Sequence, residues 1–170
     1  DFEAAVKGTV SACLLNSGQT CSAHTRMLVP EDRYDEVKAL AQAAIAKFNI
    51  GPSLEEGSKL GPLVSAAQRD RVLGFIAQGI REGAEVIAGG ATTPARDKGY
   101  FVQPTILRVR PTDTLAREEI FGPVLVVLTY KDEDEAVQIA NDTIYGLGGG
   151  VWSKDEAHAI AVARRIRIGQ

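Results

Sequence analysis

The residue types best suited to chemistry stand in one short polar segment, Asn16-Ser17-Gly18-Gln19-Thr20-Cys21. Apolar residues recur at helical spacing before it and the apolar run 27–29 follows it, so we expect a connection between a helix and a strand. Gly18 permits a sharp turn or a close approach to a ligand. A cysteine on such a connection can be exposed, as a nucleophile must be, and N–H groups of a tight turn can stabilise an oxyanion. Cys21 is therefore a candidate nucleophile, although an isolated cysteine is more often a small buried apolar residue.

A second candidate segment lies far downstream, at Glu118-Glu119-Ile120-Phe121-Gly122-Pro123. It leads into 124–130, a continuous apolar run rich in β-branched residues, which predicts a buried strand. By itself, the segment fits a plain loop in which Gly122 and Pro123 punctuate the entry to the strand.

The elements that must position these segments alternate along the chain. Helical spacing predicts helices up to residue 16, over 34–48, after a capping box at Ser65 and Gln68, from Asp132, and from Ser153 to about Ile166. Strand-like runs lie at 27–29, 86–88, 101–109, 124–130 and 148–152, the last entered through glycines. This alternation predicts an α/β fold, with helices layered on a largely parallel sheet, in a single domain over residues 1–170.

Composition narrows the class of function. The chain has 170 residues, is 45% hydrophobic and 24% charged, and carries a formal net charge of −3, all typical of a globular domain. The acidic balance argues against nucleic acid as a partner, and no polybasic patch or long apolar run suggests a membrane.

The few cysteines and histidines restrict the chemistry further. Cys13 and Cys21 are too few for a disulfide scaffold, so we expect reduced thiols, a cytoplasmic location and, for Cys13 on an apolar helix face, simple burial. His24 and His158 lack metal-ligand spacing, so we expect no metal site. His24 stands three residues from Cys21, but on a strand such residues face opposite sides, and His158 is expected to face solvent.

Both candidate segments resemble signatures of one family. Asn16, Gly18, Gln19 and Cys21 match Asn-x-Gly-Gln-x-Cys, which resembles the active-site cysteine signature of the aldehyde dehydrogenase superfamily. The downstream segment resembles the Glu-x-Phe-Gly-Pro motif of the same family, in the usual order and separation. Three further stretches agree, at 60–63, 99–105 and 140–147, so the resemblance covers essentially residues 1–170.

The resemblance implies a function for three residues. Cys21 would be the catalytic nucleophile, Glu119 would contact the nicotinamide ribose hydroxyls, and Phe121 would pack beside the nicotinamide of NAD or NADP. The implied reaction oxidises an aldehyde substrate to a carboxylic acid through thiohemiacetal and thioacyl intermediates on the cysteine. The resemblance also implies a homo-oligomer in the complete protein.

Some parts of the family pattern have no counterpart in these 170 residues. The family places a dinucleotide-binding domain, the general-base glutamate of a Glu-Leu-Gly-Gly-Lys motif and an oxyanion-hole asparagine upstream, and a strand that joins subunits downstream. We therefore expect the chain to be the catalytic part of a longer protein and inactive by itself. Two alternatives stay open: a cofactor-free cysteine hydrolase or acyltransferase with His24 as its base, and a non-catalytic domain that retains the fold.

Overall fold

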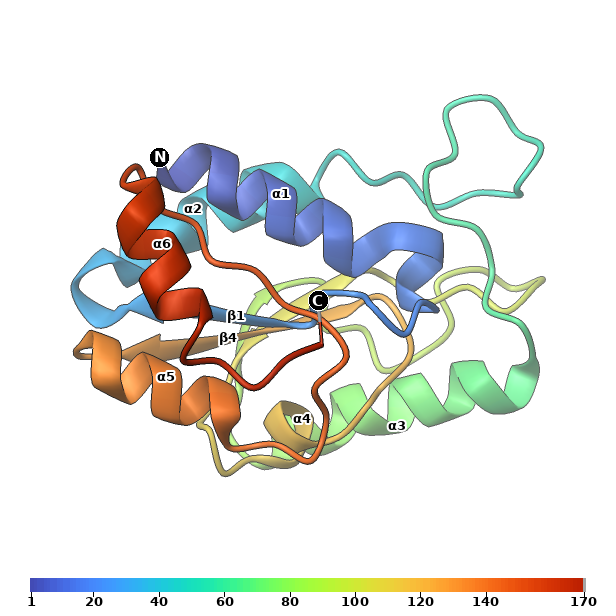
Figure 1. The fold of residues 1–170 in the computed structure, drawn as a ribbon. Coiled ribbons are helices and arrows are strands. Elements are labelled where there is room, and N and C mark those ends of the chain that lie inside the picture. The colour runs from blue at the N-terminus through green and yellow to red at the C-terminus, as the bar shows by residue number, and fades with distance from the viewer. Residues whose placement is uncertain (170) are drawn as a thin grey trace.

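Residues 1–169 are described by a computed structural model, in which helices pack on both faces of one small sheet (Figure 1). The helices are α1 (Phe2–Leu14), α2 (Tyr34–Ile45), α3 (Ala66–Arg81), α4 (Thr114–Arg117), α5 (Glu133–Asn141) and α6 (Glu156–Ala163), with short 3-10 turns η1 (Leu15–Gly18) and η2 (Glu31–Arg33). The strands are β1 (Arg26–Pro30), β2 (Glu85–Ala88), β3 (Thr105–Arg108) and β4 (Val124–Tyr130). None of the helices described is long and apolar enough to cross a membrane.

The four strands form one sheet in the order β1-β4-β3-β2. β4 pairs in parallel with both β1 and β3, whereas β2 pairs antiparallel with β3 at one edge. The predicted α/β fold with a largely parallel sheet is therefore confirmed. β1 follows the cysteine segment and β4 follows the Glu119 segment. Because these two strands pair in parallel, both begin at the same end of the sheet.

The alternation of side chains along β4 divides the core into two layers. Leu125 and Val127 point into one layer, which α1 and α2 cover, while Val124, Val126 and Leu128 point into the other, which α3, α4 and α5 cover (Figure 1). Successive side chains of a strand face opposite sides, so a strand buried on both faces must be apolar throughout. This requirement explains the uninterrupted apolar run.

Two of the expected helix starts are confirmed by their caps. The Ser65 hydroxyl accepts a hydrogen bond from the Gln68 N–H at 3.2 Å, and the Asp132 carboxylate accepts one from the Glu135 N–H at 2.9 Å. The last helix, in contrast, is capped by Asp155 and not by Ser153. The predicted helix over 34–48 ends at Ile45, and the strand expected within 101–109 covers only 105–108.

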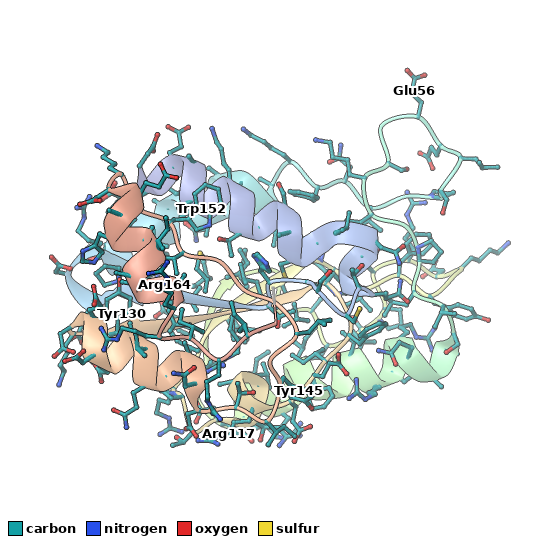
Figure 2. The ribbon with its side chains drawn as sticks, viewed as in Figure 1. Glu56, Arg117, Tyr130, Tyr145, Trp152 and Arg164 are labelled. Carbon is teal, nitrogen blue, oxygen red and sulfur yellow. The ribbon has the colours of Figure 1, made fainter. Side chains whose placement is uncertain are left out.

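The strand predicted at 148–152 was wrong. The segment pairs with no strand of the sheet. Its end is fixed instead by Trp152, which packs on Gly8 of α1 (Figure 2): a Cβ at Gly8 would lie 2.6 Å from Cζ2 of the indole. This contact ties the end of the segment to α1, and the segment does not extend the sheet.

Core packing at β3 gives a first testable expectation. Leu107 is completely buried in the layer beneath α3 and α4, so Leu107→Ala removes apolar contacts and leaves a cavity. We expect it to lower the free energy of unfolding by about 2–5 kcal/mol in urea denaturation of the full-length protein. Leu54, which is fully exposed, is the matched control, and Leu54→Ala should change this value by less than about 0.5 kcal/mol. Equal effects of the two substitutions would contradict the assigned core.

Candidate active site

The cysteine segment begins with a backbone conformation that few residues adopt. Asn16 (φ 51°) and Ser17 (φ 57°) lie in the left-handed region, and Gly18 follows at φ 74°. For residues other than glycine this region costs of order 1–3 kcal/mol each, so the surroundings must hold the turn. The Asn16 amide donates to the Gln19 carbonyl at 3.1 Å, and the Gln19 amide donates to the Asn16 carbonyl at 3.2 Å. The two motif side chains therefore close the turn on itself.

The neighbouring 60–63 loop anchors this turn from outside. The Ser17 hydroxyl, on a buried residue, donates to the Gly61 carbonyl at 3.0 Å, and the Val64 N–H donates to Oε1 of Gln19 at 2.9 Å. The stretch that sequence comparison singled out thus contacts the cysteine segment directly. Cys21 follows the anchored turn, in a connection that ends at the start of β1.

The two candidate segments touch each other at their glycines. A Cβ at Gly18 would lie 2.0 Å from the carbonyl oxygen of Gly122 and 2.9 Å from the nitrogen of Pro123. A Cβ at Gly122 would in turn lie 2.6 Å from a methyl carbon of Val72 on α3. Side chains at either position are therefore excluded by the neighbouring chain, which explains why both motifs contain glycine here.

The second segment connects α4 to β4 through an unusual turn at Phe121. Phe121 has φ 58°, the left-handed region again, and its side chain is half-buried. Glu119, two residues earlier, is exposed, whereas Gly122 and Pro123 are buried. The turn thus leaves a carboxylate and an aromatic ring accessible, directly before the chain enters the central strand.

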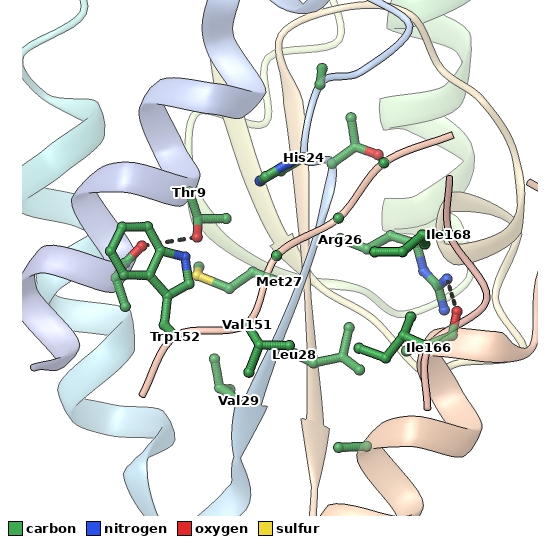
Figure 3. A pocket seen from close by; sticks show the side chains of 18 of the residues that line it. Thr9, His24, Arg26, Met27, Leu28, Val29, Val151, Trp152, Ile166 and Ile168 are labelled. Carbon is green, nitrogen blue, oxygen red and sulfur yellow. Dashed lines mark hydrogen bonds between the residues drawn. The ribbon is translucent and has the colours of Figure 1, made fainter. Parts of the chain in front are cut away.

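One cleft connects these groups. It has a volume of about 1220 Å³, and Cys21, Glu119 and Phe121 all line it. Its remaining walls come from α1, β1 and the C-terminal segment around Val151, Ile166 and Ile168, which Figure 3 shows from close by. The three residues chosen from the sequence are therefore brought to a single cavity from positions far apart in the chain.

The two cysteines differ completely in environment. Cys21 is exposed in the cleft, whereas Cys13 is buried on α1 and its thiol donates to the Val124 carbonyl at 3.4 Å. Burial raises the pKa of the Cys13 thiol to about 12, because the thiolate would lose its hydration. Both thiols are free, and the expected burial of Cys13 is confirmed.

His24 lies closer to the site than the sequence argument allowed. β1 begins only at Arg26, so the strand geometry expected to turn His24 away from Cys21 does not apply. His24 lines the same cleft (Figure 3). Within residues 1–169, no hydrogen bond joins its ring to the Cys21 thiol. His158 is exposed as expected, and its Nε2 lies 2.5 Å from a carboxylate oxygen of Glu133.

Arg26, which sequence reasoning missed, connects the cleft wall to α5 (Figure 3). Its guanidinium donates to the carbonyls of Ile139 at 2.7 Å and Ala140 at 3.5 Å, both in the last turn of that helix. Burial lowers the pKa of Arg26 from its usual value. The helix dipole makes a cationic group favourable near the C-terminal end of a helix. Arg26 therefore stabilises the position of α5 beside β1.

The contact of Gln68 with the site was also missed, because the capping box already gave this residue a local role. A capping box would direct its side chain back to the start of α3. Its amide instead donates to the Phe121 carbonyl at 2.8 Å and the Ile120 carbonyl at 3.2 Å. The only available sequence signal was its position one turn before Arg71 on the same helix, which donates to the same segment.

Comparisons with known proteins agree with this arrangement. The family model described as "Aldehyde dehydrogenase family" matches residues 1–170. Geranial dehydrogenase of Castellaniella defragrans is 45% identical over 170 residues, which are 99% of this chain and 35% of that protein. A 3-succinoylsemialdehyde-pyridine dehydrogenase of a Pseudomonas species is 46% identical over 171 residues, covering 99% of this chain and 36% of its own length.

Solved structures give the same result. A mutant aldehyde dehydrogenase C of Pseudomonas syringae, in complex with NAD+ and octanal, matches with a TM-score of 0.96 at 44% identity, over 100% of this chain and 36% of that one. A Mycobacterium tuberculosis aldehyde dehydrogenase in complex with NAD+ matches with a TM-score of 0.95 at 42% identity, over 99% of this chain and 35% of that one.

The chain therefore belongs to the aldehyde dehydrogenase family. It spans about a third of the length of the curated relatives described above.

The contact between the two motifs predicts a large effect of a methyl group at Gly18. Gly18→Ala adds a Cβ against the Gly122 backbone in a left-handed conformation. Gly83→Ala is the matched control, because Gly83 also has positive φ (93°) but has nothing within 4 Å of a Cβ. We expect Gly83→Ala to cost about 1–2 kcal/mol of unfolding free energy, from backbone strain alone. Gly18→Ala should cost about 1–3 kcal/mol more in urea denaturation of the full-length protein, and equal costs would refute the contact.

The thiol environments predict selective alkylation. With iodoacetamide at neutral pH, Cys21 should be modified in the folded protein and Cys13 should not, as peptide mass spectrometry would measure. Because the pKa of Cys13 is raised to about 12, increasing the pH to 10 should still leave it unmodified, and only denaturant should expose it. Modification of Cys13 in the native protein at a rate comparable to that of Cys21 would disprove the assignment.

Proposed function

We propose that the full-length protein containing this chain oxidises an aldehyde to a carboxylic acid with NAD or NADP, and that Cys21 is its catalytic nucleophile. The observation that carries the proposal is the meeting of an exposed thiol, an exposed carboxylate and an accessible aromatic ring in one cleft. Membership of the aldehyde dehydrogenase family supports it. So does the binding of NAD+ and octanal by the related Pseudomonas syringae enzyme.

The residues of the cleft fit a nicotinamide nucleoside. The Glu119 carboxylate has two oxygens that can each accept a hydrogen bond from one of two neighbouring ribose hydroxyls. The half-buried ring of Phe121 offers a flat apolar surface of the kind that stacks against or borders a planar ring. When bound, the nicotinamide supplies the acceptor for the hydride. We infer that Glu119 and Phe121 orient it toward Cys21.

Cys21 carries the covalent part of the proposed reaction. Its thiolate adds to the carbonyl carbon of the aldehyde, which forms a C–S bond and places negative charge on the oxygen. In the described part of the chain the Cys21 N–H donates no hydrogen bond, so it is available to stabilise that oxyanion. Loss of the hydride from the same carbon produces a thioacyl group. Attack by water then forms a C–O bond and breaks the C–S bond, which releases the carboxylic acid and regenerates the thiolate, while the remaining proton of the water passes to solvent.

The experiment measures aldehyde-dependent reduction of NAD and NADP by the full-length protein, followed by the absorbance of the reduced nicotinamide over a panel of aldehydes. Cys21→Ala should abolish this reduction, because it removes the thiol that forms the thioacyl intermediate. Cys13→Ala is the matched control, since it removes a thiol that does not line the cleft, and it should retain the turnover of the wild type. Normal turnover in Cys21→Ala would overturn the proposal.

The same protein preparation distinguishes aldehyde oxidation from the competing function, cofactor-free hydrolysis. A cofactor-free hydrolase would cleave a thioester or an activated ester without nicotinamide, and this cleavage would be lost in His24→Gln. Absence of nicotinamide reduction together with His24-dependent hydrolysis would replace the oxidation with the hydrolysis reaction.

A further inference from the structure

Three consecutive backbone carbonyls of the Glu119–Phe121 segment are held by two side chains of α3. Gln68 donates from one amide nitrogen to the carbonyls of Ile120 and Phe121, at 3.2 and 2.8 Å. Arg71 donates from Nη1 to the Ile120 carbonyl at 2.6 Å and from Nη2 to the Glu119 carbonyl at 2.8 Å. We call this pair, Gln68 and Arg71, the α3 clamp. Its bonds join residues that are 48 to 53 positions apart, so it is a tertiary contact and not part of a local turn.

The clamp binds the backbone next to the strained residue Phe121. Phe121 has φ 58°, which a bulky residue adopts only when its surroundings impose it. Fixing the carbonyls of Ile120 and Phe121, which lie on the two sides of the Phe121 Cα, restricts the φ and ψ rotations that would return Phe121 to a relaxed conformation. Gly122 continues the restraint, because it is packed against Val72, the residue that follows Arg71 on α3.

The two residues of the clamp are oriented by their places on α3. Gln68 and Arg71 stand one helical turn apart on the same face of α3, a spacing that directs both side chains to one neighbour. The Arg71 guanidinium also lies 4.7 Å from the centroid of the Phe75 ring, on the following turn, which favours its orientation toward the segment. Arg69, between the two, pairs with Asp70 and lies over Tyr100 instead.

We propose that Gln68 and Arg71 are positioning residues, which act through the backbone of the Glu119–Phe121 segment to set the direction of the Phe121 ring and the Glu119 carboxylate in the Cys21 cleft. This proposal rests on the proposed function. The clamp leaves both of those side chains free, because it takes up only main-chain oxygens. Loss of the clamp should therefore disturb the alignment of the nicotinamide with the bound substrate more than it disturbs the reactivity of the thiol.

The test uses the full-length protein with Gln68→Met and Arg71→Met combined, which remove the donors but keep unbranched side chains of similar helix propensity. Arg71→Lys keeps the charge but lacks the planar fork that reaches two carbonyls. Arg69→Met is the matched control on the same turn of α3. Three quantities are measured: the single-turnover rate of nicotinamide reduction at saturating cofactor, the kinetic isotope effect with an aldehyde deuterated at the carbonyl carbon, and the rate of Cys21 alkylation without cofactor.

In the double variant we expect the single-turnover rate to fall about 10-fold to 100-fold, the cost expected for misplacing reacting groups by around 1 Å. The isotope effect should increase, because hydride transfer becomes more strongly rate-limiting, while Cys21 alkylation stays at the wild-type rate. Arg71→Lys should give an intermediate loss, and Arg69→Met should match the wild type.

The outcomes separate this role from the proposed function. An active wild type together with an unchanged double variant overturns the clamp alone. So does a parallel loss of single-turnover rate, Cys21 alkylation and thermal stability, which would assign the two residues to folding. A wild type that reduces neither NAD nor NADP with any aldehyde overturns the proposed function and the clamp's role with it.

Discussion

The contact between the backbones at Gly18 and Gly122 is the constraint on which the site depends. A methyl group at Gly18 would lie 2.0 Å from the Gly122 carbonyl oxygen. The two backbone segments therefore approach more closely than a side chain at position 18 would permit. This approach is possible because β1 and β4 run parallel as direct neighbours, and each motif lies shortly before its strand. The cysteine segment and the Glu119–Phe121 segment are thus one packed unit, although they are far apart in the sequence.

Strained backbone is concentrated in that unit. Asn16, Ser17 and Phe121 are the three residues other than glycine that have positive φ in the described part of the chain, and all belong to the two motifs. Each strained turn is compensated by hydrogen bonds to main-chain oxygens or from main-chain nitrogens: the 60–63 loop anchors the first turn and α3 anchors the second. Strain of this kind pre-organises functional groups, because the relaxed alternatives are removed before a ligand binds.

The central strand connects this arrangement to the stability of the domain. β4 is buried from Val124 to Leu128, and its side chains serve both core layers. Cys13 is packed into the same region, where its thiol donates to the Val124 carbonyl. β4, which the second motif precedes and with which β1 pairs, is therefore the strand that both core layers share.

Much of the architecture follows from the sequence by itself. Residue periodicity decides which faces are buried, and so it was sufficient for α1, α2, α3, α5 and α6, the buried strand 124–130 and the burial of Cys13. Capping patterns indicated the helix starts at Ser65 and Asp132, whereas the short helix α4 was not predicted. The motif around Cys21 and the Glu-x-Phe-Gly-Pro motif were enough to indicate the family.

Only the tertiary structure decided how these parts meet. The Gln68 amide donates to a backbone carbonyl that lies 53 positions away in the sequence. Because every residue type has a backbone carbonyl, no pattern of side chains marks the acceptor. The failure of 148–152 to form a strand has a similar cause, because the packing of Trp152 on Gly8 depends on a helix at the other end of the chain. Local spacing encodes burial and local hydrogen bonds, whereas contacts between distant backbones exist only after the sheet has brought them together.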